Sequence, residues 1–210
     1  MTKRASVKSA AVAAFLIAVC LLFVSTIRYS GAYRIDNTEL SGWQLVPGQP
    51  GGPALLALKP PQKLTADLFR QAVEHSGSSL VAPPEPSVPL VLTDEYSDSL
   101  QGVLTLGDIM NLARDAGVET ARFEPVCVID RTAPSDRPGH VLVAVFDSPS
   151  FEQFRVQLSP LFPEHAGAAP FVPDALRPIL TIAATDNGFS RWWPMIIEPR
   201  TECSETLRAE

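Results

Sequence analysis

The strongest hydrophobic pattern in the chain is an almost wholly apolar run at residues 10–27, which contains no charged side chain. At about 1.5 Å of rise per residue, a helix of this length spans roughly 27 Å, close to the hydrocarbon thickness of a bilayer. Three basic side chains and no acidic one precede the run, at residues 1–9. The positive-inside tendency therefore predicts a cytoplasmic basic tip, a single-pass signal-anchor in the lipid bilayer, and a periplasmic or extracellular body.

Two alternatives to a retained anchor stay open. Ser30-Gly31-Ala32 is a small-x-small pattern, so a signal peptide could be cleaved after Ala32 to release a soluble domain. Arg28 and Tyr29 fit poorly between the apolar run and that site. A buried helix of a soluble protein is the other alternative, because a segment that is apolar on all sides can also lie in a core.

Proline and glycine interrupt the pattern at residues 28–63, which favours a tether with short strands at 43–46 and 54–58. Trp43 is interpreted as a core residue of the first of these strands rather than as a membrane-interface anchor. An extracytoplasmic domain is expected over residues 64–200, followed by a polar tail at 201–210.

Three segments of this domain have helical periodicity with start signals. Thr65 is a good N-cap for a helix over 66–75, with Gly77 just beyond its end. Thr105 followed by Asp108 three residues later has the spacing of a capping box. Ser148-Pro149 begins the third segment, with proline at the first helical position.

Between the helical segments, β-branched runs bounded by turn residues predict strands. Asp186-Asn187-Gly188 suits a hairpin turn between the last two of them. The fold class is therefore α+β, with a mostly antiparallel sheet and about three covering helices. The expected strands are 79–81, 88–92, 118–123, 126–130, 141–146, 179–185 and 189–197.

Charge excludes one class of partner. The whole chain has a formal net charge of −6, and without the basic tip the body carries 14 basic and 23 acidic side chains, a net of −9. Binding to nucleic acid depends on neutralising phosphates with Lys and Arg, so no nucleic-acid partner is expected.

Cys127 and Cys203 are the two cysteines beyond the apolar run. In an oxidising compartment they are natural disulfide partners. The alternative is that Cys127 is a small buried hydrophobe within a strand and that Cys203 is free on the polar tail.

Candidate chemistry is sparse. Asp130, Asp136 and His140 gather in or beside one predicted hairpin, where they would form either a metal-dependent or acid–base hydrolytic site or a solvated surface. No zinc spacing or phosphate-binding glycine loop occurs, so no metal or cofactor is predicted. The serines at 76–79 are typical of a turn, and the carboxylates at 94–98 of a solvated loop.

Arg191, Trp192 and Trp193 form the best-motivated contact surface, because adjacent tryptophans on a strand face opposite sides and one of them must be covered or displayed. The sequence thus predicts a membrane-anchored domain that binds or assembles within a cell-envelope complex. An exported hydrolase is the alternative from another class. Neither the reaction, the partner nor the oligomeric state follows from these residues.

Overall fold

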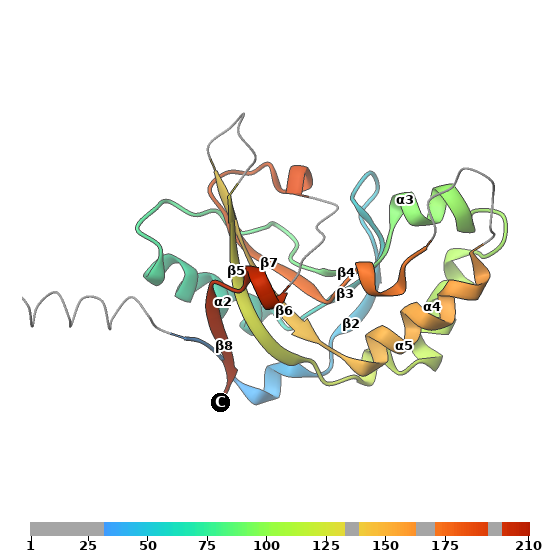
Figure 1. Cartoon of the computed structure of the whole chain (residues 1–210), viewed down its shortest axis with the longest axis horizontal. Helices are drawn as coiled ribbons and strands as arrows, with labels where there is room; N and C mark the ends of the chain where they lie inside the picture. The colour runs from blue at the N-terminus through green and yellow to red at the C-terminus, as the bar shows by residue number, and fades with distance from the viewer. Residues whose placement is uncertain (1–31, 133–138, 163–170, 193–198) are drawn as a thin grey trace, which may run out of the picture. The chain divides into compact units, whose positions relative to one another are not determined.

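The computed structural model describes residues 32–132, 139–162, 171–192 and 199–210 (Figure 1). The predicted membrane segment at 10–27 lies outside these ranges. None of the helices within the ranges is both long and apolar enough to cross a bilayer.

The described residues form an α+β fold, as the hydrophobic pattern predicts. Its elements, in chain order, are β1 (Tyr33–Ile35), β2 (Gln44–Pro47), β3 (Ala54–Lys59), α2 (Gln62–His75), β4 (Val88–Leu92), α3 (Thr93–Glu95), α4 (Leu106–Asp115), β5 (Glu124–Thr132), β6 (His140–Asp147), α5 (Pro149–Leu158), β7 (Ile179–Ala184), α6 (Pro199–Glu202) and β8 (Glu205–Ala209). Short 3-10 turns at Asn37–Leu40, Val118–Thr120 and Phe189–Trp192 join some of these elements.

The strands form two sheets. One has five strands in the order β1-β8-β5-β6-β7, and the other has three in the order β2-β3-β4. All neighbouring pairs are antiparallel except β1 and β8, which pair in parallel through Tyr33–Leu207, Arg34–Arg208 and Ile35–Ala209. The first and last described strands of the chain therefore lie side by side.

One continuous hydrophobic core joins both sheets and the longer helices. Trp43 lies at its centre, stacked on Phe123 with ring centroids 3.9 Å apart and edge-on to Phe146. The indole N–H of Trp43 donates to the Glu39 carbonyl at 2.9 Å, so its polar atom is satisfied although the ring is buried. Figure 1 shows α4 and α5 side by side, away from α2.

The predicted start signals locate two of the three longer helices. Thr105 and Asp108 form a reciprocal capping box at α4, and Ser148 caps α5 with proline in its first turn. The third helix, α2, begins at Gln62 rather than after Thr65. The Thr65 hydroxyl is not a cap, because it donates instead to the Gln62 carbonyl within the first turn.

The short strands expected at 43–46 and 54–58 are present as β2 and β3. Other expectations differ from the structure: the segment expected to be a tether also contributes β1, and the expected polar tail contributes β8. The expected strand at 118–123 begins instead with a 3-10 turn after Gly117, whose φ of +73° turns the chain. In the expected strand 189–197, the described residues form a 3-10 turn and not one arm of a hairpin.

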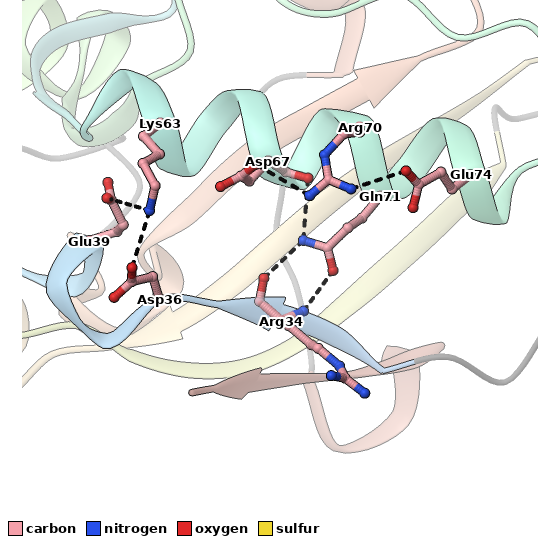
Figure 2. A network of polar contacts seen from close by, with 8 residues as sticks. All are labelled: Arg34, Asp36, Glu39, Lys63, Asp67, Arg70, Gln71 and Glu74. Atoms are coloured by element: carbon pink, nitrogen blue, oxygen red, sulfur yellow. Dashed lines mark hydrogen bonds and ion pairs between the residues drawn. The ribbon is translucent and has the colours of Figure 1, made fainter.

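A polar network fastens β1 and the turn after it to α2 (Figure 2). The Gln71 carboxamide accepts from the Arg34 backbone N–H at 2.8 Å and donates to the Arg34 carbonyl at 2.9 Å. Gln71 thus supplies the two hydrogen bonds that another strand would make on the free edge of β1. Covering an edge in this way protects it from pairing with other chains.

The same network continues at the first turn of α2. Lys63 donates to Asp36 at 3.2 Å and to Glu39 at 3.0 Å, as Figure 2 shows. The Thr38 backbone and hydroxyl also donate to Asp36. These hydrogen bonds, with Lys63 adding to those from Thr38, lower the pKa of the Asp36 carboxyl to about 2.

We expect Gln71→Ala to lower the free energy of unfolding by about 1–2 kcal/mol, because two backbone hydrogen bonds are exchanged for water. Urea unfolding measures this loss, and hydrogen exchange should be faster at the Arg34 amide. Gln62→Ala, an exposed glutamine of the same helix, is the matched control. An equal loss in both variants would mean that the loss at Gln71 does not come from its hydrogen bonds to the edge of β1, since alanine itself favours the helix.

Candidate functional site

Alternation along the strands places several polar side chains on one face of the five-stranded sheet. Val128 and Leu142 belong to the main core, whereas Ile129 and Val143 belong to a small cluster on the opposite face. Since side chains alternate along a strand, Asp130 shares the face of Val128. His140 shares the face of Leu142 for the same reason, and the two polar residues meet near the end of the β5–β6 pair.

His140 is held between a carboxylate and a hydroxyl. Its Nδ1 lies 3.0 Å from Asp130 Oδ1, and its Nε2 lies 3.3 Å from the Oγ of Ser78. With the proton on Nδ1, the ring donates to Asp130 and its Nε2 accepts from the serine hydroxyl. His140 is about 30% exposed and Asp130 about 43%, so the three groups lie at the surface and are open to a ligand from solvent.

Ser78 reaches His140 because the chain turns sharply where α2 ends. The Ser76 backbone N–H still donates to Ala72 of the helix, and the Ser78 N–H donates to the Ser76 hydroxyl at 3.1 Å. The two serine hydroxyls are 2.7 Å apart. This turn, together with the register of β6, brings residues 62 positions apart in the sequence into contact.

A second polar group lies on the same sheet face, at the last turn of α2. His75 Nδ1 is 3.3 Å from Glu205 Oε2, and the Tyr33 ring lies edge-on to the imidazole with centroids 4.7 Å apart. Burial raises the pKa of the Tyr33 hydroxyl strongly, and the Glu205 and Asp130 carboxylates raise it further. Tyr33 therefore stays protonated throughout the physiological range.

The structure describes two of the three residues of the polar site predicted from the sequence. Asp130 and His140 are brought together, whereas Asp136 lies outside the described residues. Within the described ranges no three His, Cys, Asp or Glu side chains are grouped so as to hold a metal ion. The sequence interpretation missed Ser78, because its partner lies on another element and no motif marks the pair.

The predicted contact surface at residues 191–193 begins in a 3-10 turn and not on the expected strand. Trp192 lies in a 3-10 turn, only 8% exposed, and packs in the cluster of Cys127, Ile129 and Val143 behind the sheet. The Arg191 side chain and the whole of Trp193 lie outside what the structure describes. Trp192 itself is thus a covering residue of the sheet rather than part of a displayed surface.

A disulfide joins Cys127 of β5 to Cys203, just before β8, with Cα atoms 5.7 Å apart. The sequence left a free Cys203 on a polar tail as the alternative. The tail is instead the strand β8, which pairs with β5 at Cys127–Thr206 and Val128–Glu205. This pairing brings the two cysteines together.

A groove runs along both sides of the proline-rich segment 82–89. One cavity, of about 350 Å³, lies between this segment and the β2–β3 hairpin, and the other, of about 490 Å³, lies between the segment, the first turns of α2 and β7. Both cavities are lined by Lys59, Pro83, Pro84, Glu85, Pro86 and Thr181. Gln49 donates to Glu85 and connects the hairpin loop to the proline-rich segment.

Comparison of the chain with models of protein families, with curated proteins and with solved structures finds no match.

Proposed function

We propose that this protein is a membrane-anchored, extracytoplasmic domain that binds an extended peptide segment of an envelope protein in the groove beside Pro83–Pro86. The groove is the observation that carries the binding role. Its walls are mostly apolar, and the prolines fix their backbone angles, so ordering them on binding costs little entropy. Prolines also have no N–H groups, so at these positions the wall offers an occupant only backbone carbonyl acceptors.

Two further features support the extracytoplasmic location. The apolar, basic-flanked segment at 10–27 predicts export, and the Cys127–Cys203 disulfide is of the kind that persists in oxidising compartments. Cleavage after Ala32 would leave β1 complete, because this strand begins at Tyr33. The described domain thus suits both the anchored and the released form, and the N-terminal sequence of the mature protein distinguishes them.

Site-specific photocrosslinking in intact membranes tests the binding role. A photoreactive phenylalanine at Gln62, which lines the larger cavity, should capture one defined envelope protein. The same group at Val156, an exposed residue of α5 outside the groove, should not capture it. Ala66→Trp, which adds bulk at an exposed lining position, should lower the yield from Gln62 at least severalfold.

Equal capture from Gln62 and Val156 would show that the groove is not the contact surface. The absence of any product at Gln62, in a protein that is folded and located in the membrane, would also count against the proposal. Mass spectrometry of the crosslinked peptide shows whether the captured segment is apolar and extended.

A further inference from the structure

We propose that Ser78, His140 and Asp130 form a surface hydrolytic centre in which Ser78 is the nucleophile toward small carboxylic esters. This proposal is independent of the groove and of any partner bound there. It rests on the chain of contacts from the Asp130 carboxylate through the His140 ring to the Ser78 hydroxyl, at 3.0 and 3.3 Å. A nucleophile, a base and a group that orients the base, in this order, are the groups that activate a serine for nucleophilic attack.

One set of hydrogen-bond directions fits this assignment. The Asp130 carboxylate can only accept, so Nδ1 of His140 carries a proton, and in the neutral ring Nε2 can then accept from Ser78. The Ser78 hydroxyl proton then points to His140, so the Ser76 hydroxyl is the donor in the 2.7 Å contact between the two serines. The Ser78 backbone N–H in turn donates to Ser76, which fixes the turn that presents the nucleophile.

The reaction balances without any further reagent except water. Ser78 Oγ attacks the ester carbonyl carbon as its proton passes to His140 Nε2, and that proton then leaves with the alcohol when the ester C–O bond breaks. Water attacks the resulting acyl-serine and gives a proton to His140, and the proton returns to Ser78 Oγ as the acid departs. Asp130 is a positioning residue, which holds the ring in the required tautomer and stabilises the imidazolium.

Exposure decides the class of substrate. The His140 and Asp130 side chains are open to solvent, and neither of the two cavities of the groove includes Ser78, His140 or Asp130 in its lining. Such a centre can accept a small activated ester from solvent, and neither cavity of the groove gives it a place for a long acyl chain. We therefore expect reaction with aryl acetates and with fluorophosphonates, which modify activated serines covalently.

The experiment uses the purified full-length protein, a fluorescent fluorophosphonate and p-nitrophenyl acetate. We expect wild-type protein to be labelled and Ser78→Ala to lose labelling completely. Ser79→Ala, the exposed neighbouring serine, is the matched control and should be labelled as wild type. Peptide mapping should place the adduct on Ser78.

Two further variants separate catalysis from a structural role for these contacts. His140→Gln removes the base and should slow labelling by about 10²-fold or more. Asp130→Asn should slow labelling while unfolding in urea stays close to wild type, because Asp130 is exposed. An unlabelled wild-type protein, an adduct on another residue, or an Asp130→Asn variant labelled at the wild-type rate would overturn the proposal.

Discussion

Arg155→Ala is expected to lower the free energy of unfolding by about 3–5 kcal/mol, because it removes one partner of a buried ion pair. The Arg155 side chain is only 1% exposed, and its guanidinium donates to both carboxylate oxygens of Glu95, at 2.8 and 2.9 Å. It also donates to the carbonyls of Leu90 and Pro173 at 3.3 Å. The cation lies 4.3 Å from the centroid of the Phe171 ring.

Removal of Arg155 takes away the guanidinium donor from the Glu95 carboxylate and from two backbone carbonyls. Glu95 would retain a largely buried charge, although its Oε2 still accepts from the Leu92 backbone N–H at 2.9 Å. The hydrogen bonds by which Arg155 joins α5 to Leu90 of β4 and to Pro173 would also be lost. Because an uncompensated buried charge costs far more than a lost surface pair, the effect should be among the largest of any single substitution.

Urea unfolding with the disulfide intact measures this loss. Arg177→Ala is the matched control, because Arg177 also pairs with a carboxylate, Asp147 at 3.3 Å, but both side chains are more than a third exposed. It should change stability by no more than about 1 kcal/mol. Arg155→Lys should fall between the two, since lysine keeps the charge but cannot bind Glu95 in bidentate fashion. A loss at Arg155 no larger than that at Arg177 would contradict the argument.

This ion pair also shows where prediction from the sequence ends. The sequence predicts a solvated acidic loop around Glu95 and an amphipathic helix around Arg155, with no sign that Arg155 is buried. The two are 60 residues apart, and only the tertiary placement of α5 beside β4 and α3 brings them together. Local sequence carries no information on such pairings, which depend on tertiary geometry.

Local chemistry predicts other parts of the fold well. The caps at Thr105 and Ser148 mark α4 and α5, because an orphan backbone N–H needs an acceptor at the start of any helix. The strand β8 was missed because Leu207 alone among its five residues is buried. A strand with one buried side chain has no visible hydrophobic alternation, so pairing with β1 and β5 determines it.

The candidate site is also predictable from the sequence only in part. The sequence indicates Asp130 and His140, because a short predicted hairpin places them on adjacent strands. It predicts only an ordinary turn at Ser78, since nothing in the neighbouring sequence identifies a base. The turn after α2 and the register of β6 supply that base, and both are tertiary features.

Replacement of both bridged cysteines, Cys127→Ala with Cys203→Ala, is expected to lower the free energy of unfolding by about 4 kcal/mol in the chain-entropy model. The bridge closes a loop between residues 76 positions apart, so its removal greatly enlarges the unfolded ensemble. Alkylation of the full-length protein in denaturant should modify Cys20 alone before reduction and all three cysteines afterwards.

The loss of stability on removal of the disulfide should be localised in the two terminal strands. Two residue pairs connect β8 to β5, and β8 in turn is the strand that pairs with β1. Without the disulfide, hydrogen exchange should therefore rise first in β1 and β8, at opposite ends of the described chain, while α4 stays protected as the internal control.

Wild-type protein in reductant should behave like the double variant, which separates the covalent bond from the effect of the alanine side chains. If both forms unfold at the same urea concentration as the oxidised protein, the bridge does not stabilise the fold, and the pairing of β8 with β5 is sufficient to hold the terminal strands.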